Sequence, residues 1–180
     1  MAHPVPDDEA LVRRAQAGEE AAFRDLVSRH KDRAYALALR LTGSAPDAEE
    51  VAQDAFIRAW RALPAFRFEA AFGTWLHRIV ARLALDRRER LKTRSRYEAQ
   101  EGDAPDVAAP VREEGAPLEW LLDTLSERAR AAVVLYYYED RSVAEVAHVL
   151  GAPENTVKTL LSRARDTMKE AWTREEARQR

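Results

Sequence analysis

The chain has 180 residues, no cysteine and a formal net charge of −2, and 46% of its residues are hydrophobic. This length suits one medium domain or two small ones, with enough apolar content for a packed core. The lack of cysteine excludes disulfides, Cys-ligated zinc, iron–sulfur clusters and thiol nucleophiles. Because a nonspecific DNA coat would be strongly basic, any nucleic-acid binding must depend on local patches.

Helix-forming residues dominate the composition. Ala, Leu, Arg and Glu crowd both halves, while Gly and Pro fall mostly between periodic stretches, and this usage predicts an all-α protein. Residues 1–9 lack the basic and apolar regions of a signal peptide, and no apolar run approaches the roughly 20 residues that span a bilayer. We therefore expect a cytoplasmic protein without membrane insertion.

Glycines punctuate the first helical patterns. Apolar positions at residues 11–15 predict a short helix that stops at Gly18. Apolar residues between 23 and 41 then recur at three and four, and Gly43 ends this second helix. Two helices are therefore expected before residue 43.

A third helix is expected after Asp47, which is a plausible N-cap. Its broad apolar face comprises Val51, Ala55, Phe56, Ile57, Trp60 and Leu63. Its polar face carries Glu50, Gln53, Asp54, Arg58 and Arg61. Two distinct faces imply two partners, one in the core and one outside it.

Pro64 breaks this pattern, and residues 65–71 form a short aromatic and basic loop before a fourth helix. The apolar stripe of that helix comprises Phe72, Trp75, Leu76, Ile79, Val80 and Leu83. Its polar edge is cationic, with His77, Arg78, Arg82, Arg87, Arg88, Arg90 and Lys92. Such an edge suits phosphate binding, although charged helix faces are usually only solvated.

The stretch 93–115 differs from both flanks. It holds Pro105, Pro110, two glycines, three basic residues and six acidic residues, and it shows no apolar periodicity. We interpret it as a flexible acidic linker between two small helical domains, 1–92 and 116–180. The alternative is an irregular surface loop within one domain, but structureless loops of this length are uncommon in compact folds.

The sequence pattern of the second domain predicts a helix-turn-helix. Residues 118–125 suggest a short helix, and Ser126 can cap another that reaches the tyrosine triplet 136–138. Ser142 and Glu145 form a capping box for a helix of about two turns, which Gly151 stops. After Pro153, a further helix shows a polar side composed of Asn155, Lys158, Thr159, Ser162, Asp166 and Lys169.

A polar second helix after such a turn is what reading the major groove requires. The alternative is an ordinary helical hairpin in a core or an oligomer interface, which does not require a polar face on its second helix. We prefer the DNA-binding interpretation, and we expect the protein to act by binding rather than by catalysis.

Three blocks carry a family resemblance. The segment 142–165, SVAEVAHVLGAPENTVKTLLSRAR, closely resembles the promoter-upstream-element reader of bacterial RNA polymerase sigma factors, especially the extracytoplasmic-function (ECF) group. The segment 47–60, DAEEVAQDAFIRAW, resembles their polymerase-binding helix. The segment 72–88, FGTWLHRIVARLALDRR, resembles their promoter-melting helix. The blocks occur in the family's order.

The resemblance implies specific partners: core RNA polymerase through its largest-subunit clamp helices and flap region, promoter DNA, and an anti-sigma factor. It implies polymerase contacts by Glu50, Gln53, Asp54 and Arg58. It implies start-proximal promoter recognition and melting by Phe66, Arg67, Phe68, Arg78, Arg82, Arg87 and Arg88. It implies upstream-element contacts by Asn155, Lys158, Thr159, Ser162, Arg163 and Arg165.

The chain departs from the family pattern at four positions. Leu160 stands where relatives commonly have Arg two residues after the Lys of the TVK motif, and on the helical wheel it lies nearer the apolar side. Arg82, Phe68 and Ser126 replace residues that are often Asn, Gly and Pro. Because Arg82 and Phe68 belong to the melting region, promoter preference is expected to be unusual.

Two other classes of function compete with this one. A dimeric, ligand-responsive helix-turn-helix regulator would bind its operator alone, whereas a sigma factor needs core polymerase. An enzyme fits less well, because His3, His30, His77 and His148 lack ligand spacing and no glycine-rich phosphate loop is present. We therefore expect no active site, metal, cofactor or small-molecule substrate.

Overall fold

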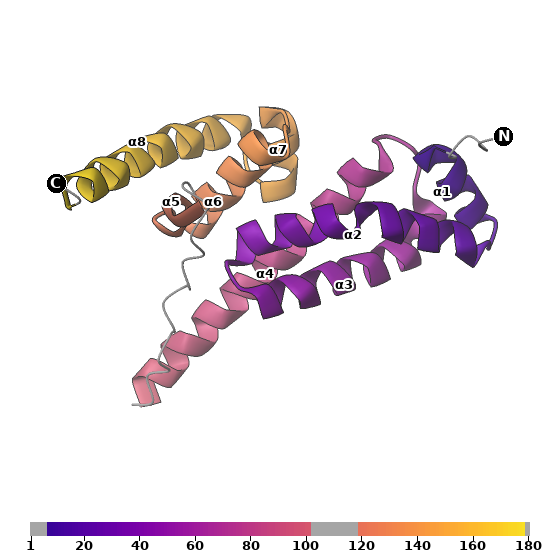
Figure 1. The fold of residues 1–180 in the computed structure, drawn as a ribbon, viewed down its shortest axis with the longest axis horizontal. Coiled ribbons are helices and arrows are strands. Elements are labelled where there is room, and N and C mark those ends of the chain that lie inside the picture. Colours follow the sequence, from indigo (N-terminus) through magenta and orange to yellow (C-terminus); the bar gives the residue numbers. More distant parts are fainter. Residues whose placement is uncertain (1–6, 102–118, 179–180) are drawn as a thin grey trace.

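The computed structural model describes residues 7–101 and 119–178. Every regular element within these two ranges is a helix, so the all-α prediction is confirmed. The helices form two regions, one on each side of residues 102–118 (Figure 1). No helix within the described ranges contains a stretch both long and apolar enough to cross a lipid bilayer.

The first region is a helical bundle. It comprises α1 (Asp8–Gln16), α2 (Glu20–Thr42), α3 (Ala45–Ala62), the short 3₁₀ turn η1 (Leu63–Ala65) and α4 (Phe72–Glu101). Helices α2, α3 and α4 pack pairwise against one another, and α1 closes the end of the bundle beside η1 (Figure 1). Fully buried core side chains include Leu11, Leu26, Leu37, Leu63, Leu76 and Val80.

The start of α3 corrects one prediction. Gly43 ends α2 in the left-handed conformation with φ 72°, and Ser44 is already the N-cap of α3. The hydroxyl oxygen of Ser44 accepts a hydrogen bond from the backbone N–H of Asp47. Asp47 is therefore in the first helical turn and not the cap, since the turn between the helices is shorter than the sequence suggested.

The space around Gly43 is also too small for a larger side chain. A Cβ atom at this position would lie 3.0 Å from Nη1 of Arg130, which belongs to the second region. Both its left-handed backbone and this close approach exclude a larger residue without local movement.

The end of α4 corrects a second prediction. The helix continues to Glu101, so residues 93–101, which were predicted to begin the linker, are helical. The rest of the predicted linker, 102–115, lies outside the described residues. This stretch of α4, TRSRYEAQE, contains two Arg, two Glu, one Gln and one Ala, whose helix propensity does not depend on apolar periodicity.

The second region contains the predicted helix-turn-helix. Its elements are α5 (Glu119–Asp123), α6 (Glu127–Val133), the π-helical turn η2 (Val134–Tyr138), α7 (Val143–Leu150) and α8 (Glu154–Arg178). Ser126 caps α6 as predicted, and Ser142 and Glu145 form the predicted capping box of α7. Gly151 ends α7 at φ 56°, and α8 packs across α7 and α6.

The two regions also pack against each other. Helix α4 contacts α6 and α7, and α2 contacts α6 and η2 (Figure 1). Two polar side chains, His77 of α4 and Glu139 after η2, are 2% and 3% exposed at this contact. The sequence predicted two domains connected by a linker, but it did not predict an interface between them.

Candidate functional site

The outward face of α8 carries the side chains predicted to read the upstream element. Val157, Leu161 and Ala164 bury the opposite face in the core of the region. Leu160 is half-buried against that core, as its place on the helical wheel suggested. The exposed set comprises Asn155, Lys158, Thr159, Ser162, Arg163 and Arg165.

These side chains are available to a ligand. Within the described residues, Lys158, Arg163 and Arg165 take part in no ion pair. Thr159 donates its hydroxyl hydrogen to the backbone carbonyl of Asn155 at 2.9 Å, which leaves the hydroxyl oxygen free to accept. This face therefore combines three cations with hydrogen-bonding groups on a rigid helix.

A second exposed face lies on α3. Gln53, Asp54 and Arg58, which are predicted to contact polymerase, are all exposed. Ile57 and Trp60 were predicted to belong to the buried side, but they are 41% and 38% exposed. The reason is that alanines 48, 52, 55 and 59, together with Val51, fill the seam against α2 and α4.

Trp60 nevertheless has a fixed position. Its ring packs on that of Phe23 with the ring centroids 4.8 Å apart. A large, oriented aromatic beside an exposed Ile and charged neighbours is typical of a protein-binding surface.

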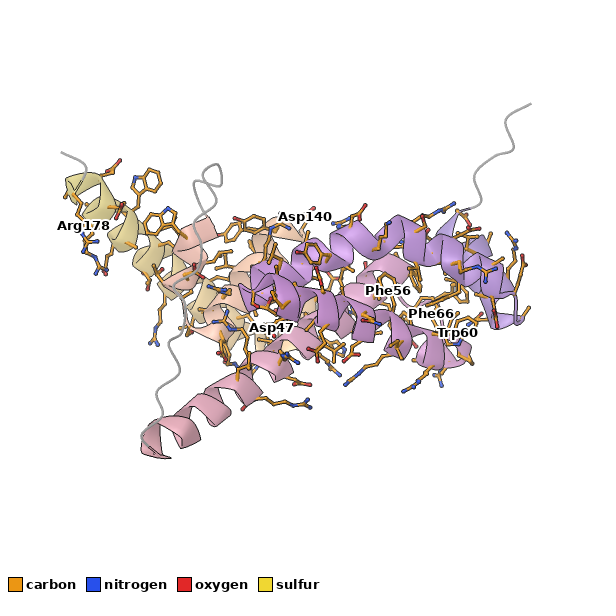
Figure 2. All side chains as sticks on the ribbon, turned by 60° about the horizontal axis from the view of Figure 1, so that its bottom comes forward. Asp47, Phe56, Trp60, Phe66, Asp140 and Arg178 are labelled. Carbon is orange, nitrogen blue, oxygen red and sulfur yellow. The ribbon has the colours of Figure 1, made fainter. Side chains whose placement is uncertain are left out.

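The loop between η1 and α4 is held by aromatic packing. Phe66, labelled in Figure 2, is only 8% exposed. The centroid of its ring lies 4.9 Å from that of Trp75 and 5.0 Å from that of Phe68. Gln16 of α1 donates hydrogen bonds of 3.0 Å to the backbone carbonyls of Leu63 and Phe66. Phe66, which was predicted to meet DNA, thus supports the loop from inside in this conformation.

Arg67 and Phe68 present the loop to the outside. Arg67 is exposed, and Phe68 is half-buried with a left-handed backbone at φ 59°. The guanidinium of Arg13 lies over the Phe68 ring, 4.5 Å from its centroid. A hollow of about 330 Å³ opens beside Phe66 and Phe68, and Asp7, Asp8 and Glu9 line its other side.

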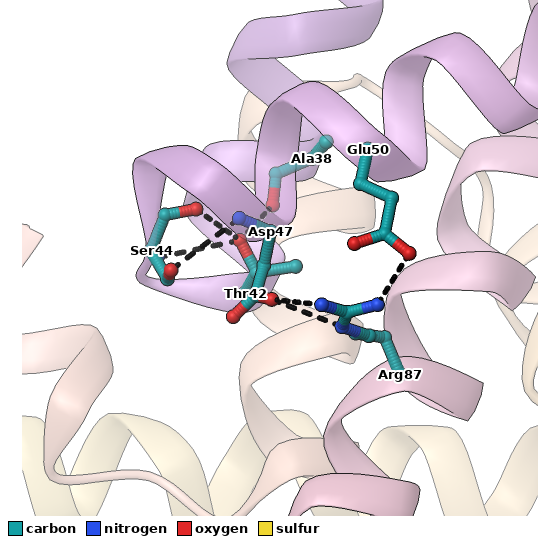
Figure 3. A network of polar contacts seen from close by, with 6 residues as sticks. All are labelled: Ala38, Thr42, Ser44, Asp47, Glu50 and Arg87. Atoms are coloured by element: carbon teal, nitrogen blue, oxygen red, sulfur yellow. Dashed lines mark hydrogen bonds and ion pairs between the residues drawn. The ribbon is translucent and has the colours of Figure 1, made fainter. Parts of the chain in front are cut away.

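The cationic edge of α4 is largely occupied. Arg82 is exposed, but Arg87 is bound to α3: its Nη1 lies 2.6 Å from the Glu50 carboxylate and its Nε 2.9 Å from that of Asp47 (Figure 3). Arg88 donates to the carbonyl of Leu41 at 3.0 Å and lies 3.5 Å from the Glu127 carboxylate.

The contacts of Arg87 and Glu50 bear on two predicted sites. Hydrogen bonds from Arg87 to the carboxylates of Glu50 and Asp47 raise the pKa of the Arg87 guanidinium. Glu50, which was predicted to contact polymerase, is therefore bound within the bundle, as is Arg87, which was predicted to contact DNA.

Two other residues of this edge, His77 and Arg78, meet the second region. Nδ1 of His77 lies 2.8 Å from Oε2 of Glu139, and the Arg33 guanidinium lies 3.4 Å from the same oxygen. Nη2 of Arg78 lies 3.9 Å from the Glu145 carboxylate, and Arg141 donates to the Thr74 hydroxyl at 2.6 Å. His77 therefore does not belong to an exposed edge, contrary to its predicted placement.

The two carboxylates at this contact are held charged. Burial alone would raise the pKa of Glu139, but the His77 hydrogen bond and the charges of His77, Arg33 and Arg141 lower it overall. The pKa of Glu145 is also lowered, chiefly by the hydrogen bond from the Ser142 backbone N–H. Both groups therefore present negative charge to α4.

Family comparisons match both regions. Residues 26–97 match the family model of Sigma-70 region 2, and residues 117–168 match that of Sigma-70, region 4. The ECF RNA polymerase sigma factor SigW of Bacillus subtilis (strain 168) is 30% identical over 173 residues, which cover 88% of this chain and 92% of SigW. The chain belongs to the ECF group of RNA polymerase sigma factors.

Solved structures agree in fold. CnrH, solved in complex with the cytosolic domain of CnrY, is similar with a TM-score of 0.64 and 29% identity, covering 92% of this chain and 97% of CnrH. The sigma factor RpoE of Bartonella quintana, solved with the anti-sigma factor NepR, has a TM-score of 0.64 at 22% identity, covering 84% of this chain and 96% of RpoE. The fold expected from the family resemblance is thereby confirmed.

Sequence reasoning missed the residues that join the two regions. Arg33, Glu139 and Arg141 carried no motif signal, because their partners lie far away in the sequence. One cue was available: Glu139 and Arg141 stand directly between the tyrosine triplet and the Ser142 capping box. A short charged turn between two packed helices is a place where an interdomain contact can form.

Proposed function

We propose that this sigma factor divides promoter recognition between its two regions. The second region reads the upstream element through the α8 face, with Lys158, Thr159 and Ser162 toward the groove and Arg163 and Arg165 toward phosphate. The first region binds core polymerase and captures the melted start-proximal element. The single observation that carries this proposal is the exposed polar face of α8 on an intact helix-turn-helix.

Polymerase binding is assigned to the outward face of α3. Gln53, Asp54 and Arg58 supply polar contacts, and the exposed Ile57 and Trp60 add apolar area at the centre of the same face. Helix-on-helix docking against the clamp helices of the largest subunit accounts for both features. Polymerase contact is thus assigned to a mixed apolar and charged patch.

Melting is assigned to the loop before α4 and to the edge of that helix. In the loop Arg67 is exposed and Phe68 is half-buried, and Arg82 adds an exposed cation on α4. A melted strand needs a surface that replaces lost base stacking, together with cations along its backbone. Phe66 contributes by fixing the loop from the core side.

An in vitro transcription assay with bacterial core RNA polymerase and a genomic promoter library tests this proposal. The wild type should give promoter-specific transcripts. Lys158→Ala should lose promoter selectivity while retaining polymerase binding, and Gln53→Ala with Asp54→Ala should lose polymerase binding. Arg174→Ala, farther along α8, is the matched control and should behave as wild type.

The competing function is a dimeric regulator that binds an operator alone. Footprinting of duplex DNA by the purified protein without polymerase separates the two. A sequence-specific footprint together with no polymerase binding would exclude the sigma mechanism for this chain.

We further propose that the protein works in the cytoplasm, without catalysis, and that an anti-sigma factor covers the α3 face. The structural neighbour RpoE was solved with such a factor, and exposed Ile57 and Trp60 offer an apolar anchor. Competition binding measures this: a true anti-sigma factor should displace core polymerase and should bind Trp60→Ala more weakly.

A further inference from the structure

The hollow of about 330 Å³ beside the loop before α4 is lined by two kinds of side chain. Part of its lining is aromatic and comes from the loop and the start of α4, and part is acidic and comes from α1 and its N-cap. These side chains are Phe66, Phe68, Phe72, Asp7, Asp8 and Glu9. Apolar walls with a few polar groups are the usual form of a site for a small ligand. The hollow therefore combines a stacking surface with hydrogen-bond acceptors.

The ring of Phe68 is held in place from α1. The Arg13 guanidinium lies 4.5 Å from the Phe68 ring centroid, a distance at which a cation is attracted to the ring face. Arg13 is itself oriented by Glu9, whose carboxylate oxygen Oε1 accepts from Nη2 at 2.6 Å and from Nε at 3.2 Å. Because Phe68 departs from the family pattern, this aromatic wall is a feature of this chain in particular.

The acidic side of the hollow is also held in place. Asp7 caps α1 with one carboxylate oxygen. The two oxygens of Asp8 lie 2.6 Å from Nε2 of His30 and 3.2 Å from Nη1 of Arg29, and the His30 ring packs edge-on against Phe72. An ionised carboxylate offers about four lone-pair sites. These partners therefore fix the carboxylates without using all of their capacity to accept hydrogen bonds.

The charge of this lining decides which part of a DNA strand can enter. Adenine and cytosine carry an exocyclic amino group that donates hydrogen bonds, whereas thymine and guanine present a carbonyl oxygen at the equivalent position. Carboxylates accept from amino groups and repel both carbonyl oxygens and phosphates. The strand backbone must therefore stay outside the hollow, where the exposed Arg67 precedes Phe68 in the loop.

We propose that α1 and the loop together form a base subsite that selects adenine or cytosine. One base of the melted strand stacks on Phe68 and donates its exocyclic amino group to the carboxylates of Asp8 and Glu9. Arg13 is a positioning residue, because it acts on the base only through the Phe68 ring. This inference rests on the proposed role of the loop in binding the melted strand, and it adds α1 to that surface.

The test uses DNA probes that differ by one amino group. The full-length protein in complex with core polymerase is titrated with single strands that carry the start-proximal element of a promoter found in the transcription assay. Adenine is replaced by purine, and cytosine by 2-pyrimidinone, at one position at a time, so that only the exocyclic amino group is lost. At the position that occupies the hollow, this loss should weaken binding about tenfold.

Removing the carboxylates should remove the preference for the amino group. Asp8→Ala with Glu9→Ala keeps the Asp7 cap, and Ala is a good helix former, so α1 should remain helical. This variant should bind the strands with and without the amino group almost equally. The matched control is Glu20→Ala with Asp25→Ala, which removes two exposed carboxylates of α2 that do not line the hollow, and it should keep the tenfold preference.

The aromatic wall is tested with an abasic strand. Phe68→Gly removes the ring, and Gly suits the left-handed backbone at φ 59°, so the loop should keep its shape. The variant should bind the adenine strand about tenfold more weakly than wild type, since stacking on an aromatic ring is lost. A strand with an abasic site at that position should bind both proteins equally. Arg13→Met should weaken binding of the adenine strand about threefold, and Arg13→Lys, which keeps a cation, should weaken it less.

Three results overturn the inference. The first is equal binding of strands with and without the amino group at every position. The second is a preference that survives in Asp8→Ala/Glu9→Ala, which would place the acceptor elsewhere. The third is an equal loss for adenine and abasic strands in Phe68→Gly, which would show that the ring only supports the loop. A wild-type complex that binds no single strand at all would instead contradict the proposed function itself, so the two failures are distinguishable.

Discussion

The two surfaces assigned to DNA differ in what they contact within the free protein. The α8 face presents Lys158, Arg163 and Arg165 to solvent. On the α4 edge, Arg87 is paired to α3, and Arg78 and Arg88 are paired to the second region, while Arg82 is exposed. A motif in the sequence therefore identifies a binding surface but does not show whether that surface is accessible.

Electrostatics explain the difference. The α8 face projects away from the rest of the molecule, whereas α4 lies between the α3 start and the α6–α7 turn, both of which are acidic where they meet it. A ligand for α8 only has to displace water, but a ligand for α4 must first replace carboxylates.

The largest effect should follow from Leu76→Ala. Leu76 is a fully buried side chain of α4, and truncating a buried leucine costs about 2–5 kcal/mol in unfolding free energy. Urea unfolding followed by circular dichroism measures the loss. If the contact couples the two regions, signals from both should shift to lower urea together; a shift confined to the first region would show that they unfold independently.

Lys158→Ala should have the next largest effect, and only on the open surface. Loss of one base or phosphate contact costs about 1–3 kcal/mol of binding free energy, measured here as promoter affinity of the polymerase complex. Unfolding should be unchanged, because the Lys158 side chain is exposed. Equal promoter affinity of variant and wild type would remove Lys158 from the reading face.

Ser142→Ala should cost about 1 kcal/mol in unfolding free energy, because it removes the N-cap of α7. Ser142→Thr keeps the hydroxyl and is the control, with a smaller loss expected. Energy transfer between dyes attached at Asp25→Cys and Glu176→Cys, one on each region, should also fall in the alanine variant, since the Ser142 hydroxyl helps to orient Glu145 toward Arg78. A loss of stability with unchanged transfer would separate the capping role from the contact.

The smallest expected effect is on how the unfolding free energy changes with pH. Both Glu139 and Glu145 have a pKa below the ordinary 4.5 in the folded protein. Their stabilising contribution is fully present above that ordinary value and is lost as pH falls through the lowered values. Unfolding free energy measured between about pH 6 and pH 3.5 should fall less steeply in Glu139→Gln/Glu145→Gln than in wild type, and identical slopes would contradict the assignment.

Much of the fold could be predicted because its signals are local. Helical spacing located the helices, Gly43 and Gly151 marked two ends, and Ser142 with Glu145 marked a start. The start of α3 was predicted three residues late, because Ser44 and Asp47 are both good caps and only the turn geometry decides between them. The extension of α4 was missed because it depends on propensity rather than on apolar periodicity.

The sequence predicted which residues form the site better than it predicted their burial and contacts. Four α8 side chains were assigned to the reading face and Arg163 and Arg165 to its flanks, and all six are exposed. Phe66 was expected to be exposed but is buried, because aromatic side chains pack together in the loop. Ile57 and Trp60 were expected to be buried but are exposed, because small alanines fill the seam of α3. The His77–Glu139 contact joins residues far apart in the sequence, and no local pattern encodes it.

Thiol labelling compares the two DNA surfaces most directly. Thr74→Cys reports on the α4 surface beneath Arg141, and Thr159→Cys reports on the α8 face. In the free protein the thiol at 159 should react quickly and the thiol at 74 slowly, and adding core polymerase without DNA should accelerate labelling at 74. Rapid labelling at both positions in the free protein would contradict the claim that one surface is open and the other is closed.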